Sequence, residues 1–419
     1  MDRAYDDDHT ARTEDRYRFA QFAARLFFLA LVTRAACDPI FDALKSVTGE
    51  GMGLGAMVNG LMTIIAACYV LRRPGAIIPV VAPIWAPFLI IAAVSVTFAP
   101  SFSHAIRLCL VQFSYCAVFA VPFYLVRSRH ALRQSLFAIL WSSVVPACWG
   151  MFQIAVPSAR FEDDASRIHA TFSHPNIFAF YLTLVISTIL YMQKSMAIRT
   201  SPVLRVYLWL YMLVLTTLLV YTKTRSAWGG MLMVFCLYGL FFQRRYLFYA
   251  LLVPAVLLLD ADVRARLADL GSNNDTPIDG NVNSYTWRVI LWTAGLNWMD
   301  GSHQILGYGL DSFKIHSAKF FPLEGRDTWD PHNVYVQLLF ETGVAGLVSY
   351  LWLFSGLLYR LGKFFKHDPP GIIILIAMTL CYLVTSWTDN MLYYLSFNWY
   401  FWFLMGAVCA AYRRRHDQV

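Results

Sequence analysis

Long apolar runs separated by short polar connections recur along the whole chain. Each run holds roughly 18 to 25 residues, enough for an α-helix to cross a hydrocarbon core of about 30 Å. The pattern therefore predicts an all-α polytopic membrane protein with about twelve transmembrane helices. We expect spans near residues 19–36, 52–71, 77–98, 105–126, 132–156, 177–192, 203–221, 228–242, 247–259, 334–361, 372–387 and 392–411, of which the ninth is the shortest.

The composition agrees with this pattern. Hydrophobic residues make up 58% of the 419 and charged residues only 14%, whereas soluble domains average about 25% charged. Eight cysteines are scattered in or beside apolar runs without a Cys-x-x-Cys pair, so we interpret them as small core residues. The first 17 residues are acidic and polar, unlike a cleaved signal peptide, and we expect the first span to stay in the membrane.

Lysine and arginine concentrate in alternate connections, and the opposite connections mix fewer of them with acids such as those at 162–164. By the positive-inside rule, the basic connections and both termini are expected to be cytoplasmic. The net charge of +8 is then mostly an orientation signal, and no nucleic-acid partner is implied. The basic positions are Arg72, Arg73, Arg127, Arg129, Arg133, Lys194, Arg199, Arg205, Arg244, Arg245, Arg360, Lys363, Lys366, Arg413, Arg414 and Arg415.

One connection, residues 260–331, is far longer than the others and is expected on the extracytoplasmic side. It divides one integrated membrane domain into residues 1–259 and 332–419. Residues 271–283 are rich in Asn, Asp, Gly and Ser, which predicts a mobile lid or linker. Residues 285–298 have amphipathic helical character and several indoles, which favours a helix lying in the headgroup layer.

The sharpest chemical signal lies where the tenth span begins. Asp330 and Pro331 are a suitable N-cap and first helical residue, so we expect His332 in the first helical turn. The helix N-terminus attracts anions and disfavours a protonated imidazole, which would suit a general base. The alternative is a histidine that only anchors a helix end. Glu341 lies deeper in the span, where we expect a buried structural partner rather than catalysis, and Gly343 and Gly346 indicate close packing.

Arginines on the same side form a second signal. Arg225 follows a Thr-Lys-Thr turn, Arg288 lies among the tryptophans, and Arg160 and Arg167 precede His174. Guanidinium groups suit phosphate oxygens, although each residue could instead be an interfacial arginine whose charge extends to water. The Asp260–Ala261–Asp262 run matches a weak metal-binding pattern, but Arg264 and Arg266 could pair with these acids at a solvated helix end. We therefore expect arginine, and no metal, to neutralise a leaving phosphate.

Several motifs together resemble the O-antigen ligase and polymerase superfamily of bacterial envelope proteins. They extend from Arg167 to about Gly346, and helices of matching number are expected on both sides. Ala227 replaces the glycine usual after the arginine turn, which is a small change. The motifs are Thr171–Asn176, Thr224–Ser226, Ser284–Trp292 with Arg288, Gly307–Phe313, His332–Asn333 and Glu341–Gly343.

The resemblance implies a GT-C-like glycosyltransferase with a lipid-linked pyrophosphate donor, inverting metal-independent transfer and no cofactor. Length, span number and the single dominant connection fit the ligase branch best. The expected reaction transfers O-antigen from undecaprenyl pyrophosphate to the lipid A–core oligosaccharide, at the periplasmic face of a Gram-negative inner membrane. His332 would be the base, and Arg225 and Arg288 would stabilise the pyrophosphate. The expected substrate-binding residues are Arg167, His174, Asn176, Lys223, Asn333 and Tyr335.

Three alternatives stay open at this point. An O-antigen polymerase would use the same donor with a second lipid-linked glycan as acceptor, and a protein O-oligosaccharyltransferase would use a Ser or Thr hydroxyl. A transporter is less favoured, because ionisable residues well inside the spans are few, chiefly Arg25, Arg107 and Glu341.

Overall fold

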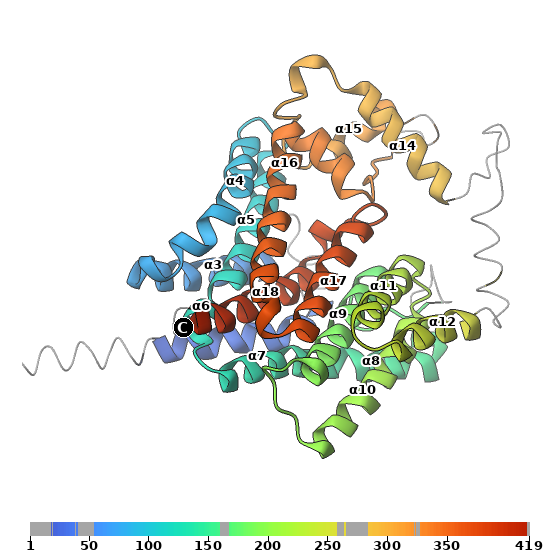
Figure 1. The fold of residues 1–419 in the computed structure, drawn as a ribbon. Coiled ribbons are helices and arrows are strands. Elements are labelled where there is room, and N and C mark those ends of the chain that lie inside the picture. Colours follow the sequence, from blue (N-terminus) through green and yellow to red (C-terminus); the bar gives the residue numbers. More distant parts are fainter. Residues whose placement is uncertain are drawn as a thin grey trace, which may run out of the picture.

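The computed structural model describes residues 18, 20–37, 39–40, 54–159, 167–257, 264, 284–321, 323 and 327–416. Within these ranges the chain is helical and contains no strand. Figure 1 shows the helices gathered into one bundle, with α14 and α15 over the end of α16. The main helices are α3 (Leu54–Arg72), α4 (Ile78–Val96), α5 (Phe102–Ala120), α6 (Pro122–Leu125), α7 (Arg129–Ser142), α8 (Val144–Ala155), α9 (Pro175–Lys194), α10 (Pro202–Tyr221), α11 (Arg225–Phe241), α12 (Arg245–Leu257), α14 (Ser284–Trp298), α15 (Ser312–Phe320), α16 (Val334–Phe364), α17 (Pro369–Thr385) and α18 (Leu395–His416).

Six helical stretches among the described residues are long and apolar enough to cross a membrane, and three shorter apolar helices accompany them. This agrees with a polytopic membrane protein, whereas the number twelve stays a prediction. Two of the six stretches each join two consecutive α-helices, α5 with α6 and α7 with α8. The predicted ninth span corresponds to α12, which has 13 residues.

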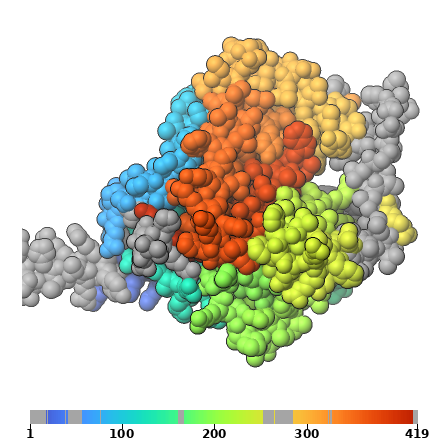
Figure 2. All heavy atoms as spheres, viewed as in Figure 1, coloured from blue at the N-terminus to red at the C-terminus, as the bar shows by residue number. Residues whose placement is uncertain are grey.

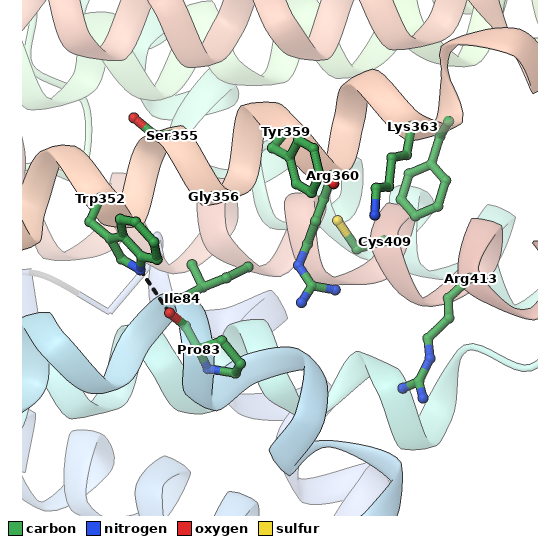
Figure 3. A pocket seen from close by; sticks show the side chains of 11 residues that line it. Pro83, Ile84, Trp352, Ser355, Gly356, Tyr359, Arg360, Lys363, Cys409 and Arg413 are labelled. Carbon is green, nitrogen blue, oxygen red and sulfur yellow. Dashed lines mark hydrogen bonds between the residues drawn. The ribbon is translucent and has the colours of Figure 1, made fainter.

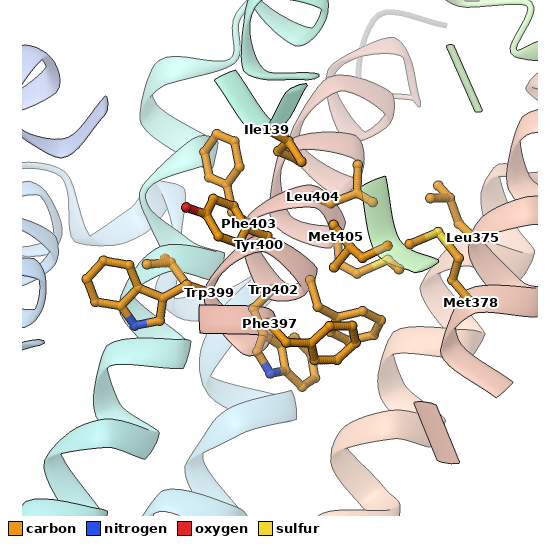
Figure 4. Close-up of a cluster of buried hydrophobic side chains, with 14 of the residues drawn as sticks. Ile139, Leu375, Met378, Phe397, Trp399, Tyr400, Trp402, Phe403, Leu404 and Met405 are labelled. Carbon is orange, nitrogen blue, oxygen red and sulfur yellow. The ribbon is translucent and has the colours of Figure 1, made fainter. Parts of the chain in front are cut away.

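The core of the bundle surrounds α18, which packs on α5, α6, α7 and α9. A helix that is apolar on every face is buried on every face, and Figure 4 shows side chains of α18 extending in several directions into the cluster. Its polar atoms reach neighbouring helices: the Trp399 indole donates to Ser114 Oγ at 3.0 Å, and the Tyr400 hydroxyl donates to the Leu31 carbonyl at 2.7 Å.

Helix α16 is interrupted at Gly343, where φ is 65° and ψ is −168°. The break removes the helical partners of the Phe340 and Glu341 carbonyls. These carbonyls accept instead from the N–H groups of Tyr308 and Gly309, at 3.0 and 2.8 Å. The N–H groups that follow the break also bond to the same loop, Val344 to the Gln304 carbonyl and Ala345 to the Ile305 carbonyl. Residues 304–309 thus complete the hydrogen bonding of the broken helix.

The hydrogen bonds between residues 304–309 and α16 bring the two backbones so close that only glycine fits at Gly307 and Gly343. A Cβ at Gly307 would overlap the backbone of Glu341, and one at Gly343 would overlap the backbone of Ile305. Both residues have positive φ. At Gly346 a Cβ would overlap the side chain of Thr342. The prediction that Gly343 and Gly346 are close-packing positions is confirmed.

Helices α14 and α15 form a cap over the first half of α16. Trp292, Phe313 and Phe340 are buried in one cluster that joins the three helices, and the indole of Trp292 donates to the Pro331 carbonyl at 2.5 Å. The helix expected over residues 285–298 is confirmed as α14. Its placement in a headgroup layer stays a prediction, and residues 271–283, predicted as a lid or linker, lie outside the described residues.

We predict that Gly343→Ala lowers the melting temperature markedly. An alanine there must adopt a backbone conformation that costs about 1–3 kcal/mol, and its Cβ meets the Ile305 backbone. Gly362→Ala, in the same helix, is the matched control, because nothing lies within 4 Å of its Cβ and alanine favours a helix. Thermal melts of both variants in one detergent test this. Equal melting temperatures would contradict the structural role given to Gly343.

Candidate active site

His332 lies just before α16 rather than inside it. Its φ is 49°, and Asn333 caps the helix, its side-chain oxygen accepting from the N–H groups of Tyr335 and Val336 at 3.0 and 3.1 Å. The predicted cap at Asp330, with Pro331 as first helical residue and His332 in the first turn, is therefore wrong. Asn is as good a cap as Asp, and here it satisfies two otherwise unpaired N–H groups, so the helix begins at Val334.

The imidazole of His332 is neutral, as expected, but for a different reason. Burial, followed by the positive charge of Arg288, lowers the pKa of His332 to about 4, against a smaller opposing effect of Asp330. The charge of His174 also lowers it. The Nδ1 atom is buried and has no hydrogen-bond partner among the described residues. A buried nitrogen in this state can accept a proton or hydrogen bond from a ligand.

Arg288 extends from α14 to the turn that follows α17. Its Nη1 donates to the Thr388 carbonyl at 2.7 Å. Its charge acts on His332 and also on the next residue in the turn, Asp389. The guanidinium therefore lies between the two sides of the site, the start of α16 and the end of α17.

Asp389 is the centre of a hydrogen-bond network that we did not anticipate. Its side chain is 2% exposed and accepts from Asn176 Nδ2 at 2.9 Å, Ser226 Oγ at 2.7 Å and the Tyr394 hydroxyl at 3.1 Å. Burial raises the pKa of Asp389, while the Ser226 hydrogen bond and the charge of Arg288 favour its ionised form. The network joins the starts of α9 and α11 to the turn between α17 and α18.

Arg167 holds the same helix starts together from the other side. Its Nη2 donates to Asn176 Oδ1 at 2.6 Å and to Thr224 Oγ1 at 2.8 Å, and its Nε donates to the Thr222 carbonyl at 2.7 Å. Lys223, between the two threonines, has a positive φ of 50°. The guanidinium is thus engaged with protein oxygens and fixes the turn that leads to Arg225. Its predicted role in substrate binding remains a prediction.

The structure brings most of the predicted residues to one end of the bundle. Arg225 is the first residue of α11, directly before Ser226, and His174 caps α9 by accepting from the N–H of Asn176 at 3.1 Å. The Tyr335 hydroxyl donates to the Leu383 carbonyl at 2.6 Å, and its role in substrate binding stays a prediction. Glu341 is fully buried, and its carboxylate accepts from Gln337 and Tyr393, which confirms the expected structural pairing.

Arg160, Asp260, Asp262 and Arg266 lie outside the described residues. Among the described residues, no group of three or more His, Cys, Asp or Glu side chains is placed to hold a metal ion. Independence from metal stays a prediction.

Comparison with known families finds a match to part of the chain. A family model described as O-Antigen ligase matches residues 210–351. This match supports assignment of the chain to the O-antigen ligase superfamily. The resemblance drawn from the short motifs is thereby confirmed. A separate comparison with curated proteins finds no match. The matched segment contains Arg225, Arg288 and His332, and the Asp389 network extends beyond it.

A signal for Asp389 is present in the sequence. It lies in a short connection between two apolar runs, on the side where His332 was expected. A carboxylate at a span end is rare and calls for a partner. Because its donors come from residues 5 to 213 positions away, the pattern along the chain could not identify them.

We predict that Asp389→Ala destabilises the protein more than Asp327→Ala. The first change removes the acceptor of three donors, of which Tyr394 is buried and Asn176 and Ser226 are half-buried, and a buried donor without a partner costs about 1–3 kcal/mol. Asp327, in contrast, is exposed. Asp389→Asn, which keeps one acceptor oxygen, should fall between them. Melting temperatures of the three variants test the order. A melt of Asp389→Ala like that of Asp327→Ala would contradict the network.

Proposed function

We propose that the protein is an O-antigen ligase. It transfers O-antigen polysaccharide from undecaprenyl pyrophosphate to the lipid A–core oligosaccharide on the periplasmic side of the inner membrane. The single observation that carries this proposal is the convergence of His332, with a buried Nδ1 and a lowered pKa, and the cation of Arg288 at one end of the bundle, in a chain with an O-antigen ligase segment.

The charges at the two ends of the bundle support the proposed periplasmic placement of the site. The site lies at the starts of α9, α11 and α16, the end that α14 and α15 cover in Figure 2. The ends of α9 and α16 and the start of α10 carry Lys194, Arg360, Lys363 and Arg205. By the positive-inside rule, the basic end faces the cytoplasm and the site faces the periplasm.

In the proposed reaction, His332 accepts the proton of the acceptor hydroxyl while the hydroxyl oxygen attacks the anomeric carbon. The bond to the pyrophosphate oxygen breaks, and Arg288 and Arg225 stabilise the charge that develops on the leaving group. One displacement inverts the configuration at the anomeric carbon. Every atom transferred comes from the two substrates, and the reaction needs no cofactor.

Donor binding makes His332 a better base. Burial and the charge of Arg288 lower the pKa of His332 to about 4. A pyrophosphate beside Arg288 brings negative charge, which favours the protonated imidazole and raises this pKa. The base strength needed for a hydroxyl therefore develops only after the donor is bound.

Asp389, Asn176 and Arg167 act as positioning residues in this proposal. Asp389 holds Ser226, the neighbour of Arg225, and its charge acts together with that of Arg288. Asn176 joins Asp389 to Arg167. The network fixes the helix ends that carry the cations before any substrate arrives, which reduces the cost of ordering them during catalysis.

We predict that deletion of the gene leaves a bare lipid A–core while lipid-linked polymer accumulates, and that the wild-type gene restores the full-length ladder. Surface glycolipid separated on a gel shows this. Core carrying a single repeat would indicate a polymerase instead. Unmodified lipopolysaccharide together with loss of glycan from a protein would indicate a protein O-oligosaccharyltransferase.

We predict that His332→Ala lowers turnover by about 10²–10⁴, the usual contribution of a general base, and leaves donor affinity largely intact. Arg288→Ala should weaken both, because the pyrophosphate is charged before and during reaction. Arg288→Lys should rescue partly, since it lacks the planar fork. Donor affinity and single-turnover rate are measured in one detergent, with melting temperature as the folding control. If His332→Ala abolishes donor binding and spares the rate, His332 is a phosphate ligand.

We predict full transfer activity in excess chelator, because arginine takes the role of a divalent cation at the leaving group. The rate of purified protein is measured with chelator alone and with added magnesium or manganese. Loss of activity that either ion restores would contradict this and would direct attention to Asp260 and Asp262.

A further inference from the structure

A groove of about 600 Å³ opens between α4, α16 and α18, toward the end of α16 that lies away from His332. Figure 3 shows side chains of α16 and α18 extending into it above Pro83 and Ile84 of α4. It shares no residue with the site of His332. The groove residues used below are Ile84, Trp352, Gly356, Arg360, Lys363 and Arg413.

Helices α4 and α16 pack against each other, with Ile84 close to Gly356, and long side chains of α16 join the two helices along the groove. Pro87 has no N–H, so it leaves the Pro83 carbonyl without its helical partner. The Trp352 indole donates to that carbonyl at 2.8 Å. Arg360 makes a second hydrogen bond from α16 to α4: its Nη2 donates to the Val80 carbonyl at 2.7 Å and closes one end of the groove.

The two ends of the groove differ in chemistry. Ile84, Trp352 and Gly356 make one end apolar, and Arg360, Lys363 and Arg413 make the other end cationic. Among the described residues that line the groove, none is acidic. This polarity matches a molecule with an apolar chain and an anionic head.

The surroundings decide which molecule can enter. Helices α4 and α16 are among the stretches apolar enough to cross a membrane, and Trp352 is 57% exposed at the edge of the groove. In a bilayer this face meets lipid, so the apolar end is reached from the membrane. The cationic end lies at the basic end of the bundle, where anionic headgroups are attracted.

We propose that this groove binds an anionic glycerophospholipid, with an acyl chain along Ile84 and Gly356 and the phosphate among Arg360, Lys363 and Arg413. Guanidinium and ammonium groups suit phosphate oxygens, and basic pockets between membrane helices are suited to anionic lipid headgroups. This lipid is not the glycan donor or acceptor, because the groove is at the opposite end of α16 from the candidate active site. The inference does not depend on the proposed reaction.

Native mass spectrometry of the full-length protein tests this with phosphatidylglycerol and phosphatidylethanolamine of identical chains. We expect tighter binding of phosphatidylglycerol, and a loss of about fivefold for Lys363→Ala and for Arg413→Ala, since a basic residue near an anionic lipid contributes about 1 kcal/mol. Lys366→Ala is the matched control, because Lys366 is exposed close to Lys363 but does not line the groove.

Ser355→Trp tests the apolar part without changing any charge. Ser355 is exposed and lines the groove, so an indole there should fill the chain site and weaken phosphatidylglycerol at an unchanged melting temperature. Equal affinity for the two lipids, or an equal loss with Lys366→Ala, would overturn the proposal by showing non-specific attraction. Displacement by glycerol phosphate at the same concentration as the lipid would also overturn it, by showing a site for soluble anions.

Discussion

The candidate site depends on the burial of one carboxylate. Asp389 accepts from Asn176, Ser226 and Tyr394, and a buried acceptor with three donors cannot release one of them without leaving a polar group unpaired. These donors belong to the starts of α9 and α11 and to the connection before α18. The position of Arg225 follows, because it is the residue before Ser226. Arg288 of α14 donates to the Thr388 carbonyl in the same turn. Its positive charge therefore lies at the contact between the cap and the bundle.

A second constraint places the cap itself. Irregular backbone at the depth of a membrane helix is tolerated where protein satisfies its polar groups, and residues 304–309 supply four hydrogen bonds to α16 around Gly343. This exchange fixes the loop between α14 and α15 against the helix that follows His332. The aromatic cluster of Trp292, Phe313 and Phe340 then sets the position of α14. The break of α16 at Gly343 thus helps to hold α14 in the position from which Arg288 contacts Thr388.

Hydrophobic periodicity was sufficient for the helical class and for most helix positions, because each apolar run carries its own signal. The neutral state of His332 could be predicted too, since burial and a nearby cation act in the same direction as the expected helix N-terminus. The helix start was missed by three residues because Asp330 and Asn333 are equally good caps in sequence, and only packing selects between them. The hydrogen bonds of Asp389 and those of Arg167 to Asn176, Thr222 and Thr224 could not be predicted. Both sets join segments that are remote along the chain. The positions of short polar side chains depend on which helix ends meet.

Helix α16 consists of two parts with different anchors. Its first part, before Gly343, is joined to the loop of the cap by the N–H groups of Tyr308 and Gly309, and it follows His332 directly. Its second part is joined to α4 by Trp352 and Arg360, and it forms a wall of the lipid groove. Because the break removes the helical hydrogen bonds that would couple the two parts, the geometry of His332 is set by the cap and by Asn333. The second part can therefore contact the membrane, through charge and shape, without changing the candidate site beside the first part.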